Sequence, residues 1–102
     1  DVAMSADSFR VDVVEQGRSG YVEYREGLRS HSFYWEFGGG DTVVSINVPT
    51  AAEWAAALPW AADRRDQVLQ RVATEACRLR CPRCRLRFGD AWIDLLEPIG
   101  DS

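Results

Sequence analysis

The sequence predicts an α+β domain in which an antiparallel sheet carries the helices on one face. Apolar and polar residues alternate in four segments of the first half, with the period of half-buried strands. Between residues 61 and 86, apolar residues recur instead at steps of three and four, which is typical of an amphipathic helix that then runs into a strand. That helix needs a cover for its apolar stripe, and the strands on both sides of it can supply one.

Four strands are predicted at residues 8–16, 21–26, 32–37 and 42–48. Turns at 17–20 and 27–30 separate the first three strands, so the simplest topology is an antiparallel meander. The inward faces of the third and fourth strands are expected to carry Phe33, Trp35, Phe37, Val44, Ile46 and Val48. These large side chains would form the core with the helix.

Two helices are predicted after Pro49. Thr50 and Glu53 have the spacing of a capping box, in which each side chain accepts a hydrogen bond from a free backbone amide. The short helix that follows carries Trp54 and ends before Pro59. The long helix is expected to bury a stripe made of Val68, Leu69, Val72, Ala73, Ala76 and Leu79.

A C-terminal hairpin is predicted after Pro82, with Gly89 and Asp90 as a two-residue turn. The apolar face of this hairpin then pairs Phe88 with Ala91, Leu86 with Ile93, and Cys84 with Leu95. The other face sets Arg85 opposite Asp94 as an ion pair and Arg87 against Trp92 as a cation–π contact.

Composition limits the classes of protein. The 102 residues are expected to form a single domain over 1–102, with loose tails at 1–7 and 98–102. Neither an apolar run of membrane-spanning length nor a signal peptide is visible, so a soluble cytoplasmic protein with no membrane partner is expected. The net charge is −4 although residues 63–87 carry +5, and we expect neighbouring acidic elements to satisfy those arginines. Nucleic acid is therefore not the expected partner.

Cys77, Cys81 and Cys84 are spaced C-x3-C-x2-C, and together with His31 they contain the four ligands of a tetrahedral zinc site. No local pattern holds His31 beside the cysteines, so zinc stays an alternative and no cofactor is predicted. Residues 81–84 also resemble the C-P-x-C redox pair of the thioredoxin family, where the motif opens a helix that activates the first cysteine. Here it follows a helix, so we expect Cys84 in the core, Cys77 at the edge of the stripe and Cys81 in a turn.

No pattern typical of catalysis is present. The glycines at 38–40 join two predicted strands and lack a neighbouring lysine, so a flexible hairpin loop is expected there rather than a phosphate-binding loop. His31 lies between two serines on an extended segment, where neighbours point to opposite faces and do not form a triad, so a solvated turn histidine is expected. The sequence therefore predicts no enzyme and no catalytic residue.

Aromatic and acidic side chains favour a protein partner. The predicted partner-binding residues are Tyr21, Tyr24, Tyr34, Glu36, Asp41, Trp54 and Trp60. Tyrosine and tryptophan supply buried contact area in interfaces, while carboxylates attract a basic partner. A compact, acidic α+β chain of this size resembles the small immunity proteins that neutralise bacterial toxins, which implies a basic toxin as the partner. Two alternatives remain, a self-associating module such as a homodimer and a thiol or zinc protein built on Cys77, Cys81 and Cys84.

Overall fold

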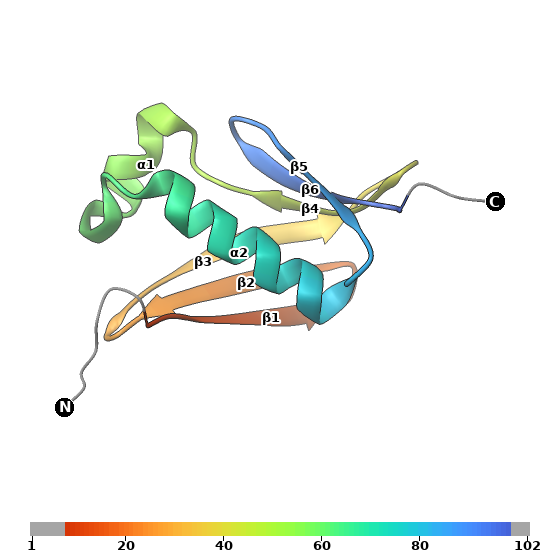
Figure 1. The fold of residues 1–102 in the computed structure, drawn as a ribbon, viewed down its shortest axis with the longest axis horizontal. Helices are drawn as coiled ribbons and strands as arrows, with labels where there is room; N and C mark the ends of the chain where they lie inside the picture. Colours follow the sequence, from red (N-terminus) through yellow and green to blue (C-terminus); the bar gives the residue numbers. More distant parts are fainter. Residues whose placement is uncertain (1–7, 99–102) are drawn as a thin grey trace.

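The computed structural model describes residues 8–98, so the predicted tails at 1–7 and 98–102 lie outside it except for Pro98. The chain forms six strands and two α-helices, with one short 3-10 helix between the helices (Figure 1). In chain order they are β1 (Arg10–Gln16), β2 (Ser19–Glu26), β3 (Arg29–Phe37), β4 (Thr42–Asn47), α1 (Ala51–Ala57), η1 (Pro59–Ala61), α2 (Arg65–Arg80), β5 (Arg85–Phe88) and β6 (Trp92–Leu96).

All six strands join one antiparallel sheet in the order β1-β2-β3-β4-β6-β5. The predicted α+β class, the four-stranded meander and the C-terminal hairpin are confirmed. The hairpin extends the meander because β6 pairs with β4, which leaves β1 and β5 at the two edges. α2 lies on one face of the sheet (Figure 1), where it contacts β1, β2 and β6.

The core lies between this face and the helices. The predicted helix stripe is buried from Val68 to Ala76, and Val44, Ile46 and Val48 of the fourth strand segment are buried as well. The largest buried side chains are Trp35, Trp54, Tyr24 and Phe33. Two predictions of burial are wrong, because Leu79 is 43% exposed in the last turn of α2 and Phe37 is 45% exposed at the end of β3.

The first two hairpin turns are tighter than the sequence suggested. Gln16 pairs with Ser19, and Glu26 pairs with Arg29, so each loop has only two residues. Gly17 and Gly27 occupy the first position of these loops with positive φ, a conformation that glycine adopts at no steric cost. The strands therefore begin earlier than predicted, and β2 and β3 face each other over their whole length.

The short helix α1 begins as predicted. Thr50 and Glu53 form both hydrogen bonds of the capping box, at 3.3 and 3.1 Å. Trp54 lies in the core, where its indole N–H donates to the Ala61 carbonyl at 2.8 Å. This bond holds α1 against η1 and so sets the position at which α2 starts.

The predicted register of the final hairpin is wrong by two residues. Phe88 pairs with Ile93, Leu86 with Leu95, and Arg87 with Asp94. The turn is longer because the Trp92 indole occupies the space beside Gly89, where a Cβ atom would come within 2.4 Å of the ring. Asp94 consequently pairs with Arg87 at 3.0 Å rather than with Arg85, while the predicted cation–π contact of Arg87 with Trp92 is present at 5.5 Å.

A polar cluster ties β2 to α2. The Glu26 carboxylate accepts hydrogen bonds from both terminal nitrogens of Arg64 at 2.9 Å and from Arg71 at 3.2 Å. It also accepts one from the Tyr24 hydroxyl. Burial alone would raise the pKa of Glu26, but the hydrogen bonds and the two guanidinium charges hold it below its ordinary value. Burial, with the Glu26 carboxylate close by, raises the pKa of Tyr24 to about 12.

Candidate binding surface

The face of β2 and β3 that points away from α2 is open. Alternate residues of these strands, such as Val22 and Phe33, are buried under the helix, while their neighbours Tyr21 and Tyr34 are 40% and 39% exposed. Tyr21 and Tyr34 pair directly across the strands, with ring centroids 5.9 Å apart in an edge-to-face arrangement. The sheet therefore presents two half-exposed aromatic rings at fixed positions.

Carboxylates flank this tyrosine pair on both sides. Glu23 follows Tyr21 by two residues and Glu36 follows Tyr34 by two residues, so both lie on the open face at opposite ends of the pair. The Tyr34 hydroxyl donates to Glu36 at 3.4 Å. Within residues 8–98 neither glutamate forms an ion pair with an arginine. We refer to Ser19, Tyr21, Glu23, Tyr34 and Glu36 as the open-face site.

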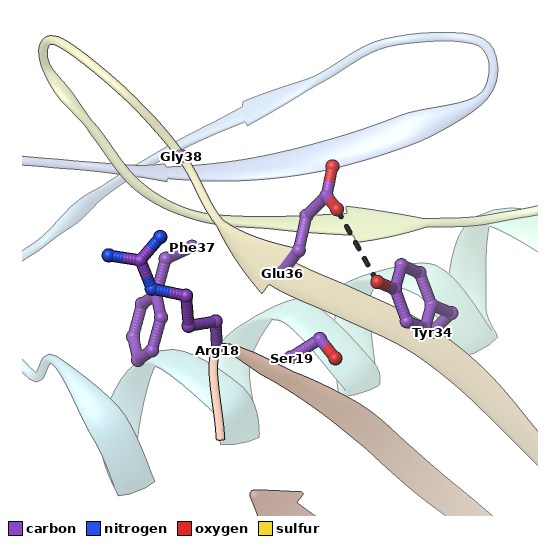
Figure 2. Close-up of a pocket in the computed structure, with 6 residues that line it drawn as sticks. All are labelled: Arg18, Ser19, Tyr34, Glu36, Phe37 and Gly38. Atoms are coloured by element: carbon purple, nitrogen blue, oxygen red, sulfur yellow. Dashed lines mark hydrogen bonds between the residues drawn. The ribbon is translucent and has the colours of Figure 1, made fainter. Parts of the chain in front are cut away.

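A hollow of about 530 Å³ adjoins the open-face site, where β2 begins and β3 ends (Figure 2). It is lined by Arg18, Ser19, Tyr34, Glu36, Phe37 and Gly38. The guanidinium, phenol and carboxylate groups give it a mainly polar wall, which suits a charged side chain of a partner better than an apolar one.

The predicted partner-binding residues divide among several places. Tyr21, Tyr34 and Glu36 lie together on the open face. Tyr24 and Trp54 are 0% and 1% exposed, so the expectation that they lie at the surface is wrong. Their polar tips explain the error, because Tyr24 finds Glu26 and Trp54 finds the Ala61 carbonyl inside the protein.

Trp60 and Asp41 do not belong to the open-face site. Trp60 belongs to η1 on the helix side of the sheet and stacks on Tyr24, with ring centroids 6.3 Å apart. Asp41 is exposed in the turn between β3 and β4, where its carbonyl accepts a hydrogen bond from the Glu97 amide. Neither residue lines the hollow beside Glu36.

The predicted partner-binding residues did not include Glu23, Ser19 or Arg18. For Glu23 and Ser19 a usable signal exists, because residues separated by two in a strand share a face and both are separated by two from Tyr21. The contribution of Arg18 to the hollow depends on the loop geometry, which the strand pattern does not give.

The cysteines gather where α2 meets β5. Cys81 and Cys84 form a disulfide, which the sequence analysis did not predict, while Cys77 is a free thiol. Cys81 lies in the turn, and Cys77 and Cys84 are half-buried against the core, as expected. Among residues 8–98, no group of three His, Cys, Asp or Glu side chains is arranged to hold a metal ion.

His31 lies in β3 and not in a turn, so that prediction is wrong. It pairs with Tyr24 and is half-buried, with its ring 4.6 Å from the Phe33 ring, and burial lowers its pKa. His31 therefore lies near the start of α2, because its neighbour Tyr24 contacts Glu26 and Glu26 contacts Arg64 there. Cys77 belongs to the last turns of the same helix. The helix separates these two ends by about 20 Å, so the fold does not bring His31 to the cysteines.

No helix of residues 8–98 has the length and apolar character needed to cross a membrane. Comparisons with protein-family models, with curated proteins and with solved structures found no match.

Proposed function

We propose that this chain is a protein-binding domain of the inhibitor or immunity type, without catalytic activity, and that its open-face site binds a basic protein such as a bacterial toxin. The observation that carries the proposal is the half-exposed Tyr21–Tyr34 pair between two carboxylates that no arginine of the described chain neutralises. Rigid tyrosines at fixed positions are efficient contact residues, because few rotatable bonds must be ordered when a partner covers them.

The charges support a cationic partner. The chain carries a net charge of −4, which would steer a basic protein toward it. Asp12 and Glu23 lie directly opposite each other on β1 and β2, and two like charges in that position cost stability unless cations lie near them. Asp12 has Arg10 at 3.0 Å, which leaves Glu23 and Glu36 as the carboxylates available to a partner.

An arginine of the partner fits the open-face site best. Its guanidinium can lie on the face of a tyrosine ring while it forms hydrogen bonds with a neighbouring carboxylate. The hollow beside Tyr34 and Glu36 has room for one such side chain. Arg18 on the opposite wall would then meet an acidic or carbonyl group of the partner.

The experiment begins with native mass spectrometry of the tagged protein purified from its own host cells. Any chain present in stoichiometric amount is identified, produced separately and titrated against variants of the domain. We expect a basic chain whose dissociation constant rises about thirtyfold for Tyr34→Ala, as for an interface hot spot of about 2 kcal/mol. Glu36→Gln is expected to slow association, most strongly at low salt.

Two control variants lie on the helix side of the sheet. Phe88→Ala removes an aromatic ring that is 45% exposed, close to the 39% of Tyr34, and Glu75→Gln removes a carboxylate of α2. Both should bind like the wild type. An acidic partner, or equal affinities for the Tyr34 and Phe88 variants, would contradict the proposal. A homodimer as the only assembly would favour the self-associating alternative.

A further inference from the structure

α2 joins β5 at one end of the sheet (Figure 1). All three cysteines belong to this join, Cys77 to the last turns of α2, and Cys81 and Cys84 to the turn that follows. The Cys81–Cys84 disulfide closes this turn, and both cysteines are partly exposed. Cys77 lies beneath it, with its sulfur 3.1 Å from the Cys81 carbonyl oxygen and 3.5 Å from the Cys84 carbonyl oxygen. A free thiol is therefore held beside a disulfide that solvent can reach.

The surroundings of this disulfide are positively charged. Arg78 and Arg80 pair with Glu75 and Glu15, but within residues 8–98 Arg83 has no ion pair or hydrogen bond. Arg85 donates to the neutral carbonyl of Glu97 and keeps its full charge. Two uncompensated guanidinium groups thus flank Cys84 in the sequence, and such groups attract thiolates and stabilise a thiolate when it leaves a disulfide.

We propose that the Cys81–Cys84 disulfide is a thiol–disulfide exchange site for anionic thiols such as a glutathione-type peptide, with Cys77 as an internal third thiol. In the first step the thiolate of the incoming molecule bonds to one cysteine sulfur, the sulfur–sulfur bond breaks, and the other cysteine leaves as a thiolate. A second molecule of the same thiol then releases the first as a symmetrical disulfide. Two protons taken up from the thiols complete the reduced Cys81 and Cys84 pair, so that atoms and electrons balance.

Cys77 adds a route that consumes no second thiol. Its thiolate can attack the mixed disulfide, which forms a bond from Cys77 to Cys81 or Cys84 and releases the incoming thiol unchanged. The same attack on the intact disulfide exchanges one internal pair for another without any external reagent. The Cys77 sulfur already contacts the backbone carbonyls of both disulfide cysteines, so this exchange would take place within one turn of the chain.

The test measures how fast the folded protein is reduced by thiols of different charge. Glutathione is anionic at neutral pH, 2-mercaptoethanol is neutral, and the products are trapped with iodoacetamide and mapped by mass spectrometry. Arg83→Gln should slow reduction by glutathione roughly threefold at low salt, the effect of one charge about 7 Å away in water. Reduction by 2-mercaptoethanol should slow less, because its thiolate carries only the charge on sulfur, whereas the glutathione thiolate carries further negative charge. Arg29→Gln, at the opposite end of the sheet, is the matched control and should change neither rate.

The internal thiol is tested in the same samples. Partly reduced wild-type protein should contain a disulfide that includes Cys77, and Cys77→Ser should lack it while keeping the charge preference. Reduction that occurs only at the rate of global unfolding, followed through its urea dependence, would overturn the proposal. An equal response of the Arg83 and Arg29 variants to glutathione would overturn the recognition of anionic thiols.

Discussion

The strongest prediction about stability concerns Glu26. Replacing Glu26 by alanine removes the carboxylate that Arg64 holds with two hydrogen bonds and that Arg71 and Tyr24 also contact. The side chains of Arg64, Arg71 and Glu26 are only 27%, 13% and 10% exposed, so solvent replaces the lost contacts poorly. The variant removes the carboxylate that both guanidinium groups contact.

Breaking a buried ion pair by removing one partner typically costs 3–5 kcal/mol, and we expect about 4 kcal/mol for Glu26→Ala. That is a large share of the roughly 5–15 kcal/mol that stabilises a domain of this size. Glu26→Gln keeps the shape and one acceptor oxygen, so about 2 kcal/mol is expected for it. Asp12→Asn breaks an ion pair in which the Arg10 side chain is 74% exposed and the Asp12 side chain is 46% exposed. It should cost about 0.5 kcal/mol or less.

Urea unfolding at pH 7, followed by circular dichroism and tryptophan fluorescence, gives the three free energies of unfolding. The expected order is Glu26→Ala as the least stable, then Glu26→Gln, then Asp12→Asn close to the wild type. If Glu26→Ala cost no more than Asp12→Asn, the cluster would contribute nothing to the attachment of β2 to α2, and the reasoning would be refuted.

Three further predictions test the same structure. Folding lowers the pKa of Glu26, so the ionised carboxylate stabilises the fold above the ordinary carboxyl pKa near 4.5, and this stabilisation is lost as the pH falls below that value. Urea unfolding should therefore show a smaller difference in stability between the wild type and Glu26→Gln at pH 3 than at pH 7. Spectrophotometric titration should show a phenol that ionises near pH 12 in the wild type and is absent from Tyr24→Phe. Stability should fall above pH 10, because Tyr24 ionises near its ordinary pKa of 10.0 in the unfolded chain but only near 12 in the folded one. Gly20→Ala should lower the free energy of unfolding in urea by about 3 kcal/mol, because the added Cβ would lie 1.9 Å from the Val14 carbonyl oxygen, which accepts a hydrogen bond from the Trp35 indole N–H. Wild-type stability of this variant would contradict the close approach of β1 and β2.

The sequence predicts local features of this fold well. Alternation locates the strands, the Thr50 and Glu53 spacing locates the start of α1, and the stripe from Val68 to Ala76 identifies the buried side of α2. Leu79 points to the same side of the helix as Val68, yet it is exposed in the last turn. Periodicity gives the direction of a side chain but not the point at which the covering sheet ends.

The parts that the sequence did not predict depend on contacts between distant segments. The hairpin register depends on the Trp92 indole over Gly89, and the burial of Tyr24 depends on partners in α2 that lie about 40 residues away or more in the chain. For the candidate site, strand alternation separates Tyr21 from Tyr24, since they lie on opposite faces. The pairing of Tyr21 with Tyr34 follows only once the two-residue turn at Gly27 is known.

The most direct measurement of the central claim is carboxylate footprinting of the domain alone and in complex with the basic partner. Exposed carboxylates are converted to amides with a carbodiimide and an amine, and each site is quantified by mass spectrometry. We expect Glu23 and Glu36 to be protected in the complex while Glu75 on α2 reacts equally in both samples. Protection of Glu75 with full reactivity of Glu23 and Glu36 would place the partner on the helices and contradict the assignment of the open-face site.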